Sequence, residues 1–173
     1  MNVKKYIDFI LDLLTIEDDI EIKYDKCIKL AKFVVYDDGK PCILLNDNML
    51  KNELEMRYAV THELRHYYQW LVVFNKEYYD LENESTRLIW KDNFKNYVPY
   101  EESAKYTHQP LEVDAVCFTQ LIMMTLYNIV MDDFKQNDIK FKDRLYILSL
   151  DFTQDEIVEI MGFHGIKKEP HSN

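Results

Sequence analysis

Apolar residues along most of the chain recur with the period of an α-helix. This spacing of three to four residues predicts a first amphipathic helix over residues 3–16. The same spacing, with capping residues and prolines at the ends, predicts five more helices. They are expected over residues 51–74, 84–97, 110–131, 142–150 and 153–162. The helix that begins at Pro110 is apolar on most sides and is therefore expected at the centre of the fold.

Residues 20–45 show the shorter period of β-strands. Between Ile20 and Tyr24, apolar residues alternate with charged ones, as in a half-exposed strand. Further on, two apolar runs flank the sequence DDGKP at residues 37–41, which is a strong signal for a hairpin. Pro41 has no N–H for a strand ladder, so the strand that it begins is expected at an edge. We therefore expect a small antiparallel sheet packed on the second helix.

The order of these elements, one helix, a small sheet and then helices, indicates a helix-rich α+β fold. With 173 residues and 47% hydrophobic side chains, the chain is long enough for one domain with a substantial core. We expect this single domain over residues 1–165. The sequence IKKEPHSN, residues 166–173, is expected to form a flexible tail.

Charge and cysteine content narrow the classes of function. The formal net charge is -10, from 31 acidic and 21 basic side chains. Such a surface repels phosphate backbones and carries no basic patch, so direct nucleic-acid binding is not expected. With 30% charged residues, no association with a membrane is expected.

The three cysteines form no C-x-x-C pair. They are expected to be buried free thiols in a reducing, cytoplasmic compartment.

The sequence HELRH, residues 62–66, carries the strongest chemical signal. His62 and His66 are one turn apart on a predicted helix, so both imidazoles can reach one metal ion. Two nitrogen ligands suit Zn²⁺, and Glu63 lies on the flank, where its carboxylate can hold a water molecule. The alternative is a helix with two solvated or two core histidines. The mixed apolar and polar character of the surrounding helix face argues against it.

A catalytic zinc site has three protein ligands and one position for water. His108 and Glu112, further along the chain, are the candidates for the third ligand. Glu112 lies in the first turn of the apolar helix that begins at Pro110, where the helix dipole favours a carboxylate. Because so apolar a helix is expected to be buried, and buried carboxylates are normally paired or bound to metal, ligation by Glu112 is favoured.

An HExxH sequence followed by a helix with E-x-x-A resembles the gluzincin metallopeptidases. Here the second motif is EVDA, which begins at Glu112 and ends at Ala115. Its helix, LEVDAVCFTQLIMM, is similar to that of the ImmA/IrrE-like peptidases, which reads roughly E-x-E-A-x-x-F-A-x-x-L-L-M. Besides these two residues, Phe118 and Met124 match that pattern directly. The resemblance covers the two helices that carry the motifs and, in part, the preceding sheet.

The resemblance implies a zincin-like fold and a small intracellular zinc metallopeptidase. His62, His66 and Glu112 would bind Zn²⁺, and Glu63 would be the general base that takes a proton from the attacking water. The partner would be a protein or peptide substrate, for instance a regulatory protein in a bacterium or phage.

Peptide hydrolysis also needs a donor that stabilises the oxyanion. Tyr106 and His108, just before the second motif, are placed to supply it, as are Tyr97 and Tyr100. For each single residue, however, ordinary packing or a place in a loop is expected ahead of a catalytic role.

Two further expectations concern the surroundings of the site. Asp114 is expected either to accept a hydrogen bond from a ligand imidazole or to pair with a basic group such as Arg65. Many peptidases bind substrate as an added strand at a sheet edge, and the run at residues 41–45 is the most plausible edge, although it could equally close the core.

A non-catalytic reading is the main alternative. The acidic chain could be a binding or inhibitor protein on a metallopeptidase scaffold, with a structural metal. Glu63 distinguishes a peptidase from such a binding protein, because a structural metal site makes no use of the Glu63 carboxylate. A metal-free helical interaction domain is a third possibility.

Overall fold

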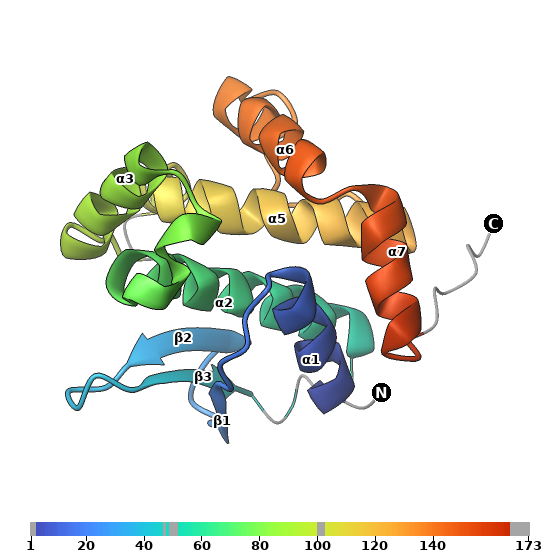
Figure 1. Ribbon diagram of the computed structural model, residues 1–173, viewed down its shortest axis with the longest axis horizontal. Coiled ribbons are helices and arrows are strands. Elements are labelled where there is room, and N and C mark those ends of the chain that lie inside the picture. The colour runs from blue at the N-terminus through green and yellow to red at the C-terminus, as the bar shows by residue number, and fades with distance from the viewer. Residues whose placement is uncertain (1–2, 47, 49–51, 100–102, 167–173) are drawn as a thin grey trace.

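The chain forms one helix, a three-stranded sheet and then a series of helices, which confirms the α+β fold class (Figure 1). The computed structural model describes residues 3–46, 48, 52–99 and 103–166. Of the predicted tail, only Ile166 lies within these residues. The elements are α1 (Val3–Leu13), β1 (Glu21–Tyr24), β2 (Ala31–Val35), β3 (Pro41–Leu45), α2 (Glu53–Phe74), the 3-10 helix η2 (Lys76–Leu81), α3 (Glu84–Lys95), α4 (Ser103–Tyr106), α5 (Pro110–Tyr127), α6 (Ile139–Asp151) and α7 (Gln154–Phe163).

All six predicted helices are present, and local hydrogen bonds explain where their ends differ from the prediction. α5 ends at Tyr127 instead of residue 131 because Asn128 adopts a left-handed conformation with φ 55°, and its N–H bonds to the last carbonyl groups of the helix. α6 begins earlier than predicted because the side chain of Asp138 caps it, by accepting a hydrogen bond from the Lys140 N–H.

The sheet is mixed, which corrects the expectation of an antiparallel sheet. Its order is β1-β3-β2, and β3 pairs parallel with β1 and antiparallel with β2. β2 and β3 form the predicted hairpin, whose turn contains Gly39 at φ 82°. β3 takes the middle because it is the most apolar strand. Its side chains Cys42, Ile43 and Leu45 are fully buried, whereas most of β1 is exposed.

Pro41 does not place its strand at an edge, contrary to the expectation from the sequence. It is the first residue of β3, and β1 pairs with β3 only from the Glu21–Cys42 pair onward. The missing N–H of Pro41 therefore leaves no hydrogen bond of the ladder unmade. The edge strands are β1 and β2, and β2 packs against α2.

α2 and α5 lie side by side at the centre of the fold (Figure 1). They run in opposite directions, since Arg57 near the start of α2 bonds to Tyr127 at the end of α5, whereas Arg65 bonds to Asp114 near its start. The sheet packs against α2, and α6 packs against α5 (Figure 1). Residues 111–123 of α5 are all buried, as expected for a central helix.

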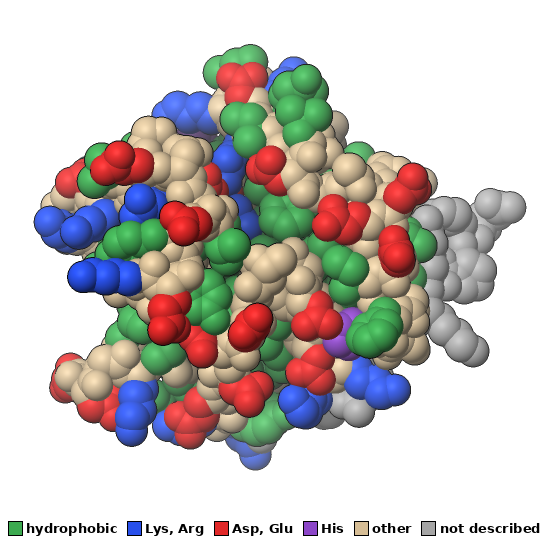
Figure 2. All heavy atoms as spheres, in the orientation of Figure 1, with side chains coloured by type: hydrophobic (Ala, Val, Ile, Leu, Met, Phe, Trp, Pro, Cys, Tyr) green, Lys and Arg blue, Asp and Glu red, His purple; other side chains and the backbone are tan. Residues whose placement is uncertain are grey.

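The surface carries many charged side chains and a few exposed apolar ones. Figure 2 shows acidic and basic side chains mixed over one face, with apolar side chains over α6 at the top of the view. Within the described residues, no helix is long and apolar enough to cross a membrane.

The three cysteines are free thiols. Cys42 and Cys117 are buried, as expected, but Cys27 is exposed because it lies in the loop between β1 and β2.

Candidate metal centre

His62 and His66 lie in the middle of α2. Asn52 caps the start of this helix, where its side chain accepts a hydrogen bond from the Glu55 N–H. Because the two histidines are four residues apart, they lie on the same helix face. Their ring centroids are 4.7 Å apart and their Nε2 atoms 3.1 Å apart, and both side chains are buried.

The antiparallel packing of α2 and α5 brings Glu112 to these histidines. Glu112 lies in the first turn of α5, close behind Pro110, a residue that favours the start of a helix. Its Oε2 atom is 3.3 Å from Nε2 of His62, and its Oε1 atom is 3.2 Å from Nε2 of His66. Only 1% of Glu112 is exposed, so its carboxylate requires a positive partner.

The spacing of these three side chains suits a metal ion. His62, His66 and Glu112 each offer a ligand atom, and these atoms lie within 4.8 Å of one another. A tetrahedral ion with bonds of about 2.0–2.1 Å separates its ligand atoms by about 3.3 Å. The two Nε2 atoms are 3.1 Å apart, close to that value, and they lie 3.3 and 3.2 Å from the two different oxygens of Glu112. This buried group could hold a metal ion, and within the described part of the chain it is the only group of its kind.

The electrostatics of the group favour a bound cation. Burial lowers the pKa of His66, but the charge of Glu112 and the hydrogen bond to it outweigh burial and raise the pKa to about 9. Burial acts on Glu112 in the opposite sense and raises its pKa. The charge of His66 and hydrogen bonds from both histidines outweigh that effect and hold the pKa of Glu112 well below its usual range. Glu112 is therefore ionised and attracts positive charge into the buried group.

Glu63 lies beside this group, at the junction of α2 and the sheet. Its side chain is half-buried, and Oε2 accepts a hydrogen bond of 2.7 Å from the Phe33 N–H on β2. Burial and the charge of Glu112 dominate the pKa shifts of His66 and Tyr106, and the charge of Glu63 adds to both. The Glu63 carboxylate is therefore close to the candidate ligands and is held by a backbone group.

Three tyrosines adjoin the group. Tyr97 donates a hydrogen bond of 2.5 Å to Oε1 of Glu112, and its ring meets that of Tyr106 edge to face. Burial raises the pKa of Tyr106, and so do the charge of Glu112 and a hydrogen bond to it. Tyr58 stacks on His62, with centroids 6.2 Å apart. Two of the predicted oxyanion donors, Tyr97 and Tyr106, thus lie next to Glu112.

His108, which the sequence offered as a ligand or an oxyanion donor, has other partners. Its Nε2 atom is 3.0 Å from Oδ2 of Asp138, and its ring packs edge to face on Phe141. These partners lie just before and within α6. The structure therefore brings Glu112, and not His108, to the paired histidines. Tyr100 lies outside the described residues.

Asp114 pairs with two arginines, which confirms one of the two expectations for it. Its carboxylate accepts hydrogen bonds from Nε of Arg65 at 2.8 Å and from Nε of Arg144 at 2.6 Å. The Arg65 guanidinium also lies over the rings of Tyr68 and Phe118. Burial opposes the ionisation of Asp114, but the two arginines outweigh it and hold the pKa of Asp114 well below its usual range.

Gln69 and the backbone of Phe33 belong to the site. Gln69 was expected on the helix face of His62 and His66, but without a role, and Phe33 was not expected at the site. Oε1 of Gln69 lies 2.8 Å from Nδ1 of His66. The sequence contained a signal for this contact, because residues three apart are neighbours on a helix. It contained none for Phe33, whose contact with Glu63 depends on how β2 packs against α2.

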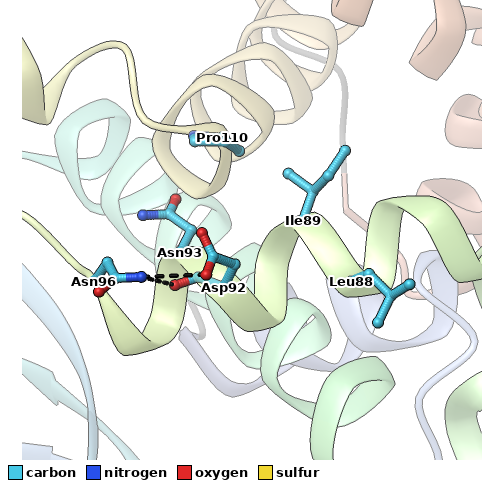
Figure 3. Close-up of a pocket in the computed structure, with 6 residues that line it drawn as sticks. All are labelled: Leu88, Ile89, Asp92, Asn93, Asn96 and Pro110. Atoms are coloured by element: carbon cyan, nitrogen blue, oxygen red, sulfur yellow. Dashed lines mark hydrogen bonds between the residues drawn. The ribbon is translucent and has the colours of Figure 1, made fainter.

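A separate pocket lies between α3 and the start of α5 (Figure 3). Its volume is about 410 Å³, and it is lined by Leu88, Ile89, Asp92, Asn93, Asn96 and Pro110. The candidate ligands, Glu63 and the three tyrosines are not part of its lining. The side chains with the chemistry of a metal centre therefore lie outside this pocket.

The chain was compared with known proteins at three levels. Models of protein families, curated proteins and solved structures all failed to match it. The resemblance to the gluzincin metallopeptidases thus rests on the residues of the two motifs alone.

Proposed function

We propose that this protein is a zinc-dependent metallopeptidase that hydrolyses a peptide bond in a protein or peptide. The observation that carries the proposal is the convergence of His62, His66 and Glu112. The two Nε2 atoms are 3.1 Å apart and lie 3.2–3.3 Å from the Glu112 carboxylate, and one ligand atom from each residue lies within 4.8 Å of the others. The Glu63 carboxylate beside them supplies the base that a purely structural metal site does not need.

Zn²⁺ is the metal that this donor set suits best. Two imidazole nitrogens and one carboxylate are typical ligands of catalytic zinc, and three protein ligands leave one coordination position open. When bound, zinc supplies a Lewis acid that lowers the pKa of water and polarises a carbonyl group. Glu63 then takes the proton of the attacking water and passes it to the leaving amine. The Phe33 N–H keeps the Glu63 carboxylate in place for both transfers.

The phenol of Tyr106 is the proposed oxyanion donor. Its ring packs edge to face on Tyr97, which hydrogen-bonds Glu112, and burial and the charges of Glu112 and Glu63 raise the pKa of Tyr106. Tyr97, which donates to Oε1 of Glu112, is better suited to hold that ligand.

The Tyr106→Phe variant tests this assignment. Loss of one oxyanion donor is expected to lower the rate of peptide hydrolysis by zinc-loaded protein about 100-fold. The measurement is the initial rate of cleavage of a peptide mixture, followed by mass spectrometry. Tyr146→Phe, at an exposed position on α6, is the matched control and should keep the wild-type rate. Equal rates for Tyr106→Phe and the control would remove Tyr106 from the mechanism.

β2 is the proposed binding edge for substrate, in place of the residues 41–45 expected from the sequence. It is an edge strand, and its Phe33 N–H points away from β3 and toward Glu63. In an extended strand the C=O of a residue points to the same side as its N–H. An added peptide strand along β2 would therefore run past the Glu63 carboxylate.

Zinc binding gives the direct test of the proposed function. The protein is expected to bind one equivalent of Zn²⁺, measured by titration calorimetry and metal analysis. Glu112→Gln removes the ligand charge with little change of shape and is expected to weaken zinc binding by at least about 100-fold. Glu159→Gln, at an exposed position on α7, is the control and should bind as the wild type does. Wild-type protein that binds no zinc would rule out the proposed function.

A further inference from the structure

Gln69 joins the candidate ligand His66 to the first turn of α5. It lies on α2 and is fully buried. Its Oε1 atom is 2.8 Å from Nδ1 of His66. Its Nε2 atom is 3.0 Å from the C=O of Leu111, the residue before Glu112, and 2.6 Å from Oδ2 of Asp114. One amide thus contacts a histidine of one helix and two groups of the other.

The partners of Gln69 determine which way its amide points. The Leu111 C=O can only accept a hydrogen bond, and the Asp114 carboxylate already accepts from Arg65 and Arg144, so the NH₂ group of Gln69 must face them. The opposite orientation would place the Gln69 oxygen against two acceptors, with no proton between them. The amide oxygen therefore faces His66.

This orientation fixes the tautomer of His66. Because the Gln69 oxygen can only accept, Nδ1 of His66 must carry a proton. In the neutral ring Nε2 then bears the lone pair, and Nε2 is the atom that lies 3.1 Å from Nε2 of His62 and 3.2 Å from Glu112. The hydrogen bond thus prepares His66 as a ligand through the correct nitrogen.

The arginines around Asp114 hold this arrangement. Arg65 and Arg144 donate to the Asp114 carboxylate and hold it in place as an acceptor for Gln69. The contact of Gln69 with Leu111 also fixes the backbone beside Glu112. A chain of hydrogen bonds therefore runs from the buried ion pairs through Gln69 to one candidate ligand and to the turn that carries another.

We infer that Gln69 is a positioning residue of the metal centre, which fixes the tautomer of His66 and ties α2 to the turn of α5 that carries Glu112. The inference rests on the proposed function, because it assigns a role toward the metal that His62, His66 and Glu112 would hold. Partners of this kind raise metal affinity by orienting the ligands before the ion binds.

The test compares Gln69→Met with Gln69→Glu. Methionine fills a similar volume without an acceptor, so Zn²⁺ affinity, measured by competition with a chromophoric chelator, is expected to fall about 10–100-fold. The visible absorption spectrum of bound Co²⁺ should change as well, since it reports the ligand geometry. Gln69→Glu keeps an acceptor opposite His66 but sets a carboxylate oxygen against the Leu111 C=O and Asp114, so its Zn²⁺ affinity should fall as well.

Gln120→Met is the matched control. Gln120 is likewise a fully buried glutamine, and it hydrogen-bonds Ile129 and Met131 at the other end of α5. Its replacement should lower the melting temperature but leave Zn²⁺ affinity and the Co²⁺ spectrum unchanged. Wild-type zinc affinity in Gln69→Met or in Gln69→Glu, or an equal loss in Gln120→Met, would overturn the inference. If the wild type binds zinc, these results leave the proposed function intact. If it binds none, the proposed function and the inference both fail.

Discussion

Glu63→Gln is expected to abolish peptide hydrolysis while leaving zinc binding intact. The rate should fall about 10²–10⁴-fold, the range for removal of a general acid–base group, because the amide cannot take a proton from water. The fold should tolerate the change, since the glutamine oxygen can still accept the hydrogen bond from the Phe33 N–H. Zinc affinity should remain near the wild-type value because Glu63 is not one of the three converging ligands.

To compare Glu63→Gln with the wild type, the cleavage rate and the zinc affinity are measured on the same preparation of each protein. Glu55→Gln is the matched control, because Glu55 lies on the same helix but is exposed in its first turn. It should cleave a peptide mixture at the wild-type rate. If wild-type protein with bound zinc cleaves nothing, or if Glu63→Gln cleaves as fast as the control, the peptidase proposal is wrong. A binding or inhibitor protein with a structural metal would then be the better account.

Asp114→Asn is expected to destabilise the fold by about 3–5 kcal/mol, the cost of breaking a buried ion pair by removing one partner. Asp114 and Arg65 are each 1% exposed, and Arg144 also bonds to the carboxylate. An asparagine would leave two guanidinium groups without their shared counter-charge. The free energy of unfolding, measured by urea denaturation, gives the loss. Asp143→Asn, at an exposed position on α6, is the control and should change it little.

The Asp114 carboxylate should also make the free energy of unfolding depend on pH. The pKa of Asp114 is lower in the folded protein than in the unfolded chain, because the two arginines outweigh the effect of burial. Its contribution to stability is therefore complete above the unfolded pKa of about 4 and is lost as the pH falls toward the folded value. The free energy of unfolding of the wild type should decrease below about pH 4 more steeply than that of Asp114→Asn. If the free energies of unfolding of the wild type and Asp114→Asn fell in parallel with pH, the stabilising role assigned to the ionised Asp114 would be wrong.

Helical periodicity predicted much of this fold because most of the chain packs through helix faces. The positions of the six longer helices and the burial of α5 followed from the spacing of apolar residues. The sheet was harder, because alternation identifies strands but not their order. β3 was expected at an edge because of Pro41, yet its residues Cys42, Ile43 and Leu45 are apolar on both faces, which is the stronger signal for a central strand.

The candidate site was predictable where one helix determines the geometry. His62 and His66 share a face whatever the rest of the fold does. Glu112 was expected from its charge in an apolar helix, and the packing of α2 on α5 brings it to the histidines. The partners of His108 and of Glu63 depend instead on how α6 and β2 pack, which local sequence does not determine.

An anomalous difference map at the zinc absorption edge, from crystals grown with Zn²⁺, would test the metal centre most directly. One strong peak should lie about 2.0–2.2 Å from Nε2 of His62, Nε2 of His66 and a carboxylate oxygen of Glu112. A map with no peak between these three side chains, or with zinc bound only by other residues, would contradict the account.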